Sequence, residues 1–194
     1  MTNLITIIDI QKYKPLSKNI DTAKKVDPFI QEAQEFDLRP FLSDEFYLDL
    51  ISDFLSSPSL IKYNDLFFGS IWTKGSRTYE NPGIISMLCY YSYARYQNVA
   101  NTNQTAFGTV GKNNPDSTPI TDKTINRLVS QADSGAKAFE NRVRFYLDCN
   151  PDIYPLWECG ISNKKTGSVR ISQGGGNSTN RRRYDPINKR YYYE

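Results

Sequence analysis

Hydrophobic and polar positions follow helical spacing through most of the first 150 residues of the chain. The clearest pattern has apolar residues spaced alternately four and three positions apart. These residues are Ile125, Val129, Ala132, Ala136, Phe139, Val143 and Tyr146. The spacing predicts a long amphipathic helix over 122–148, about 40 Å from end to end. Thr121 is the expected N-cap and Asn150-Pro151 the stop.

Shorter helical patterns precede this helix. They predict four helices. The first starts at Asp27-Pro28 and is ended or bent by Pro40, and the others run over 43–55, 60–68 and 84–99. The 84–99 segment is apolar or tyrosine-rich on nearly every side, which is typical of a central, buried helix.

Short β elements are expected between the helices. Leu4–Ile10 is rich in Ile and Thr and predicts a strand or an extended arm. The stretch SIWTKGSRTYEN (70–81) predicts an irregular or hairpin segment, and 101–120 predicts a long loop with a strand at 106–110.

The expected fold class is therefore mainly α, a bundle of four to five helices with a long C-terminal helix, small β-hairpin elements and an extended C-terminal arm. We expect three parts, namely an N-terminal extended arm or strand (1–26), a helical body (27–159) and a basic, tyrosine-rich arm (160–194).

The charge of the chain is unevenly distributed. Residues 160–194 hold eight Lys and Arg against two acidic residues, which gives a net charge of +6. Residues 1–159 hold sixteen basic and nineteen acidic residues, a net charge of −3. A basic arm on an acidic body indicates that the arm has a charged partner.

The composition offers little for catalysis. The chain has no histidine, and its three cysteines, Cys89, Cys149 and Cys159, form no CxxC pair. We expect no enzyme activity, no cofactor and no metal site. We also expect no membrane association and no secretory signal, so that the protein matures in the cytoplasm.

Three carboxylates, Glu45, Asp49 and Asp53, line up along the predicted 43–55 helix. They allow a Mg²⁺ site in a metal-dependent enzyme, but the favoured interpretation is a hydrated face opposite the apolar one. The Gly108–Lys112 segment resembles a phosphate loop only faintly and is interpreted as a turn.

The final residues of the arm admit three interpretations: an idle tail, a nucleic-acid hook and a docking arm that becomes ordered on a protein partner. Tyrosine and arginine are enriched at protein interfaces, which favours docking. The candidate docking residues are Arg181, Arg182, Arg183, Tyr184, Arg190, Tyr191, Tyr192 and Tyr193.

Several motifs together resemble a known kind of protein. They are EAQ within 30–51, DLRPFLSDEFY in the same segment, YYSYARY and TAFGTVGKN. Residues 27–150 resemble an uncharacterised family of structural proteins in tailed phages of gut bacteria, including crAss-like phages. The layout is similar to that of head–tail connector (adaptor) proteins, and the resemblance does not include the final arm.

The resemblance implies a virion structural protein at the head–tail junction, assembled in the host cytoplasm. It implies a homo-oligomeric ring of twelve copies beneath the portal protein, with tail or further connector proteins on the other side and transient contact with passing DNA. On this interpretation Glu45, Asp49 and Asp53 are a candidate acidic face of the genome ejection channel. The alternative is a nucleic-acid-binding protein that uses its basic aromatic tail.

Overall fold

The computed structural model describes residues 2–17, 25–56, 60–100, 102–106, 108–111, 121–157, 182–185 and 190–193. The chain divides into two compact units, Met1–Cys159 and Gly160–Glu194. We call the first unit the body and the second unit the arm, and each is described by itself.

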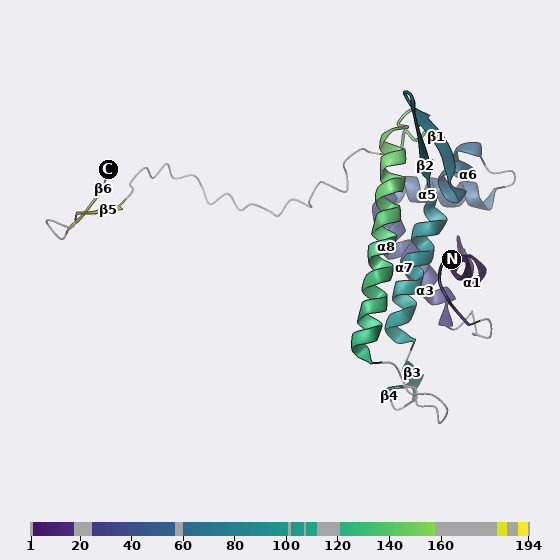
Figure 1. The fold of residues 1–194 in the computed structure, drawn as a ribbon, viewed down its shortest axis with the longest axis horizontal. Helices are drawn as coiled ribbons and strands as arrows, with labels where there is room; N and C mark the ends of the chain where they lie inside the picture. The colour runs from purple at the N-terminus through teal and green to yellow at the C-terminus, as the bar shows by residue number, and fades with distance from the viewer. Residues whose placement is uncertain are drawn as a thin grey trace. The chain divides into compact units, whose positions relative to one another are not determined.

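The described part of the body is mainly helical, as the sequence predicted (Figure 1). Its elements in chain order are α1 (Ile7–Tyr13), α3 (Asp27–Ala33), the π-helix η1 (Gln34–Leu38), α4 (Arg39–Leu42), α5 (Asp44–Leu55), α6 (Ile61–Phe68), β1 (Ser70–Lys74), β2 (Arg77–Asn81), α7 (Ile84–Val99), β3 (Thr102–Thr105), β4 (Gly108–Gly111) and α8 (Asp122–Asp148). The predicted helices over 43–55, 60–68, 84–99 and 122–148 are confirmed as α5, α6, α7 and α8.

The centre of the body is the pair formed by α7 and α8, which lie antiparallel and side by side in Figure 1. Ala132 and Ala136 are fully buried in this contact, and the small side chains let the two helices approach closely. Gly135 has the same effect, because a Cβ atom at this position would lie 2.5 Å from Cε1 of Tyr90 on α7. The Tyr91 hydroxyl of α7 donates a 2.6 Å hydrogen bond to the Glu140 carboxylate of α8.

The prediction of a strand over Leu4–Ile10 is wrong. Residues from Ile7 onward form α1, because the Asp9 carboxylate accepts a 3.0 Å hydrogen bond from the Thr6 backbone amide and closes a capping box. Leu4, Ile5 and Ile10 are buried in the common core, so these residues belong to the helical body and form no separate arm.

The first long helix does not end at Pro40. Helix α3 continues through η1 into α4, and the Arg39 amide donates to the carbonyl of Gln34, five residues earlier, as in a π-helix. The helix ends at Leu42, and the next residue, Ser43, has a φ of 83°. Ser43 therefore separates α4 from α5, whose residues Phe46, Tyr47 and Leu50 pack in the core.

Two antiparallel hairpins extend from the ends of the helices. Strands β1 and β2 pair from Ser70 with Asn81 to Lys74 with Arg77, so the hairpin expected over 70–81 is confirmed. Strands β3 and β4 pair Thr102 with Gly111, and Ala106, which was expected to begin a strand, lies in the turn between them.

Candidate interaction surfaces

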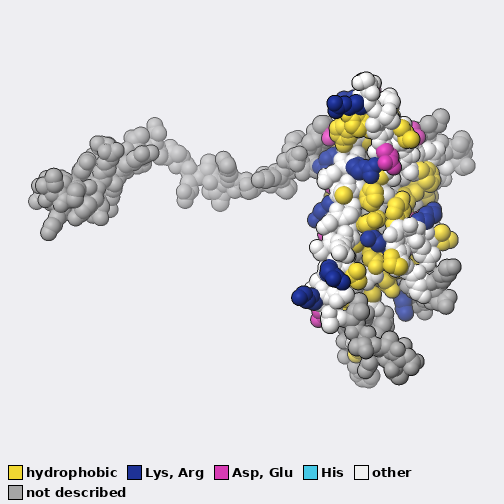
Figure 2. All heavy atoms as spheres, viewed as in Figure 1, with side chains coloured by type: hydrophobic (Ala, Val, Ile, Leu, Met, Phe, Trp, Pro, Cys, Tyr) yellow, Lys and Arg dark blue, Asp and Glu magenta, His cyan; other side chains and the backbone are white. Residues whose placement is uncertain are grey.

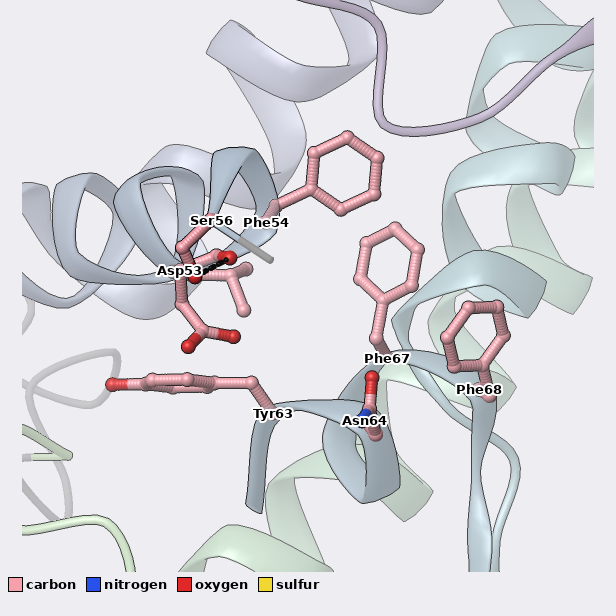
Figure 3. A pocket seen from close by; sticks show the side chains of 8 residues that line it. Asp53, Phe54, Ser56, Tyr63, Asn64, Phe67 and Phe68 are labelled. Atoms are coloured by element: carbon pink, nitrogen blue, oxygen red, sulfur yellow. Dashed lines mark hydrogen bonds between the residues drawn. The ribbon is translucent and has the colours of Figure 1, made fainter. Parts of the chain in front are cut away.

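An aromatic groove lies between α5 and α6, close to the end of α5 (Figure 3). Its volume is about 130 Å³, and its lining is Leu50, Asp53, Phe54, Ser56, Tyr63, Asn64, Phe67 and Phe68. The rings of Phe54 and Phe67 pack with centroids 5.2 Å apart, and Phe68 packs edge-on against Phe67 at 5.2 Å. The groove therefore presents a set of aromatic rings that support one another.

The apolar side chains at this groove extend onto the surface of the body. Phe54 is 37% exposed and Phe68 is 67% exposed, although both are large and apolar. Leu55 and Leu60, at the adjoining helix ends, are 62% and 54% exposed. An exposed apolar cluster of this kind on a folded domain indicates a contact with another molecule. We call these four residues and the groove lining the α5–α6 patch.

Two of the three predicted acidic-face residues hold α5 and α6 together. Asp49 accepts a hydrogen bond from the Tyr63 hydroxyl, and the Asp53 carboxylate accepts a 2.9 Å hydrogen bond from the Leu60 amide. Burial, followed by the hydrogen bond to Asp49, raises the pKa of Tyr63 above its ordinary value. Glu45 and Asp49 are exposed and Asp53 is half-buried, which agrees with a hydrated face.

The acidic residues show no sign of a metal site. Among the residues that the structure describes, no group of three His, Cys, Asp or Glu side chains is close enough to hold a metal ion. The channel-facing role of Glu45, Asp49 and Asp53 stays a prediction, and the structure adds a role in joining α5 to α6 for two of them.

Strands β5 (Arg182–Asp185) and β6 (Arg190–Tyr193) of the arm bring together most of its predicted docking residues. They pair antiparallel, with Arg182 opposite Tyr193, Arg183 opposite Tyr192 and Tyr184 opposite Tyr191. Seven of the eight predicted docking residues therefore lie in one ladder, and Arg181 lies outside the described residues. Asp185-Pro186 and Asn188 are turn-forming residues between the two strands, and they were the available sequence signal for a hairpin.

The outer face of α8 is mainly polar from Lys123 to Arg142, and Figure 2 shows Lys and Arg side chains along it beside a band of hydrophobic side chains. Phe145, near the end of the helix, is 43% exposed. Its exposed residues include Lys123, Asn126, Arg127, Ser130, Gln131, Ser134, Lys137, Ala138, Asn141 and Arg142. Arg142 pairs with Glu80 of β2 at 2.8 Å, and Lys137 pairs with Asp133 at 3.6 Å. This face is long and nearly straight, and it carries no large aliphatic side chain between Lys123 and Arg142.

The two cysteines of the described body differ in their surroundings. Cys89 is buried in α7, and this burial raises the pKa of its thiol to about 12. Cys149 accepts a 3.1 Å hydrogen bond from the Lys74 ammonium group, and Cys159 lies outside the described residues. No helix in the described parts of the chain is both long enough and apolar enough to cross a membrane.

The body is thus a helical domain with an exposed aromatic patch, and the arm contains a basic, tyrosine-rich hairpin. The chain belongs to DUF6712, a family of unknown function, and the match covers residues 38–167. The matched range includes α5, α6, α7 and α8 and stops before β5. No curated protein and no solved structure matches the chain.

Proposed function

We propose that this protein is a virion structural protein, a head–tail connector (adaptor) subunit that assembles into a ring beneath the portal and docks through its C-terminal arm. The proposal combines the resemblance of residues 27–150 to connector proteins with two features of the structure. These features are the polar outer face of α8 and the separate arm with its basic aromatic hairpin.

The observation that carries the proposal is the ladder of β5 and β6. An isolated two-stranded hairpin is marginally stable in water, and both of its strands have unpaired edges. Arginine and tyrosine at these positions suit a segment that gains its stability on a partner, by adding to a sheet or by filling a groove. The arm is thus better suited to docking than to independent folding.

Ring formation requires two different surfaces on each subunit that fit one another. The long outer face of α8 and the β3–β4 hairpin are the surfaces that we assign to neighbouring subunits. Twelve copies are expected, because the ring has to match the symmetry of a portal. Tail proteins or a further connector ring would occupy the opposite side, and the acidic residues Glu45, Asp49 and Asp53 would face passing DNA or a protein partner.

The proposal is tested by removing residues 174–194 and comparing the truncated chain with the full chain. The full chain is expected to associate with itself and with a portal protein, and the truncated chain is expected to lose both associations while its helical content is retained. The measurements are mass photometry for size and circular dichroism for the fold.

The alternative, a nucleic-acid-binding protein, is favoured by the net charge of +6 in residues 160–194. It predicts binding to DNA that weakens steeply as salt increases and that disappears with the same deletion. If the truncated chain loses DNA binding and keeps its association with protein partners, the connector proposal fails and the alternative replaces it.

A further inference from the structure

The α5–α6 patch needs an occupant, because its apolar side chains are large, clustered and exposed. Phe68 and Leu55 are both more than 60% exposed, at the rim of a groove of about 130 Å³. An engineered apolar cavity of about 150 Å³ accepts a benzene molecule, so a groove of this size suits one aromatic ring. The lining rings of Phe54, Phe67 and Tyr63 offer edge-to-face contacts to such a ring.

The charge next to the groove is negative. Helix α5 contains neither Lys nor Arg. Asp53 lines the groove and Asp49 bonds the Tyr63 hydroxyl of its lining, whereas Asp44, at the other end of the helix, is paired with Arg39 at 2.6 Å. Glu45 has no hydrogen-bond or ion-pair partner among the residues described. The nearest cation on α6 is Lys62, whose ammonium group lies 4.4 Å from the centre of the Tyr63 ring. An occupant that carries aromatic rings and positive charge would therefore complement this surface.

The arm of the same chain has this chemistry. In the β5–β6 ladder, Arg182 pairs with Tyr193 and Tyr184 pairs with Tyr191, so the two strands carry arginine and tyrosine at neighbouring positions. Twenty-four residues separate Trp157, the last described residue of the body, from Arg182. At about 3.3 Å per residue they span up to about 80 Å, which is enough to reach a neighbouring subunit.

We infer that the α5–α6 patch is the receptor for the arm of a second copy of this chain, with tyrosine in the groove and arginine on the carboxylates of α5. This inference rests on the proposed connector function, since a ring needs a contact that repeats from subunit to subunit. The patch of one subunit and the arm of the next form a heterologous contact of this type. The acidic face of α5 then receives a protein partner in place of DNA.

Photo-crosslinking in the full chain tests where the arm docks. The chain carries p-benzoylphenylalanine in place of Phe68, and unlabelled and nitrogen-15-labelled chains are mixed before irradiation. The expected crosslinks join position 68 to residues 181–193, and some of them join a labelled chain to an unlabelled chain. Crosslinks between like isotopes alone would show that the arm folds back on its own groove, and the absence of arm crosslinks would show that the groove has another occupant. Either result overturns the inference.

A pair of exposed-site variants separates this inference from the connector proposal. Phe68→Glu adds negative charge inside the patch and is expected to weaken self-association about tenfold or more. Ile71→Glu is the matched control, because Ile71 is 77% exposed on β1 and does not line the groove. Equal association of the two variants contradicts the inference. If association still depends on the arm in that case, the connector proposal survives with a different receptor.

Discussion

At the scale of single residues, one buried amide attaches the N-terminal segment to the body. Gln34 is fully buried, its side-chain Oε1 accepts a 2.7 Å hydrogen bond from the Leu4 amide, and its side-chain Nε2 donates to the Thr2 carbonyl at 3.1 Å. The local pattern of Ile and Thr predicted a strand or an extended arm at Leu4. Gln34 is thirty residues away, so its contact with Leu4 leaves no periodic signal in the sequence.

Replacing Gln34 with leucine tests this attachment. Gln34→Leu removes the acceptor for the buried Leu4 amide and is expected to lower the free energy of unfolding by about 2–3 kcal/mol. Urea denaturation followed by circular dichroism measures the change. Gln31→Ala is the control, since Gln31 is only partly buried and bonds the Asn3 side chain at 3.2 Å, and it is expected to cost less than about 1 kcal/mol. Equal costs for the two variants would contradict this account of Gln34.

At the scale of elements, helical periodicity predicted most of the body. The boundaries of α5 to α8 were readable because capping residues, glycines and prolines flank each apolar pattern. Periodicity also identified the apolar side of α5, where Phe46 and Leu50 are buried. It did not reveal that Phe54, on the same side, is only partly covered, because the extent of cover depends on where α6 packs.

The junction of α6, the β1–β2 hairpin and α7 depends on glycine. Gly83 has a φ of 78°, and a Cβ atom there would lie 2.5 Å from the Phe67 carbonyl oxygen. Gly83→Ala is therefore expected to lower the free energy of unfolding by about 3 kcal/mol or more. Gly75→Ala, in the hairpin turn, is the control, because φ is also positive there (62°) but the space around it is open, and about 1 kcal/mol is expected. Thermal unfolding of both variants measures the difference, and similar melting temperatures would contradict the proposed close packing.

At the scale of the whole molecule, burial of ionisable groups makes stability sensitive to alkaline pH. Burial raises the pKa of Cys89 from 9.0 to about 12, and burial also raises the pKa values of Tyr91 and Tyr154 above 10.0. The raised folded-state pKa values favour the protonated forms, so the contribution of these three groups to the free energy of unfolding is fully present below pH 9. It is lost as pH rises toward the folded-state values.

We therefore expect the free energy of unfolding to fall as pH rises above 9. Chemical denaturation at a series of alkaline pH values measures this decline, and tyrosinate absorbance reports when the phenols ionise. A free energy that stays constant from pH 9 to pH 11 would contradict burial of these three groups.

The sequence predicted three parts and showed the basic charge of residues 160–194, whereas the pairing of β5 with β6 was not predicted. The tyrosine triplet predicted an extended segment for the arm, because tyrosine favours strands. The turn-forming residues Pro186 and Asn188, which lie between Asp185 and Arg190 in the sequence, indicate a hairpin instead. The groove of the α5–α6 patch is formed by two helices, and the sequence pattern of neither helix alone predicts it.

The central claim is that the arm joins this protein to other subunits. Its most direct test is the mass of the particle formed by the full chain and by the chain without residues 174–194, each measured by mass photometry alone and with a portal protein of the same genome. The account predicts a ring-sized particle for the full chain and only smaller species for the truncated chain. Identical particle masses with and without the arm would contradict it.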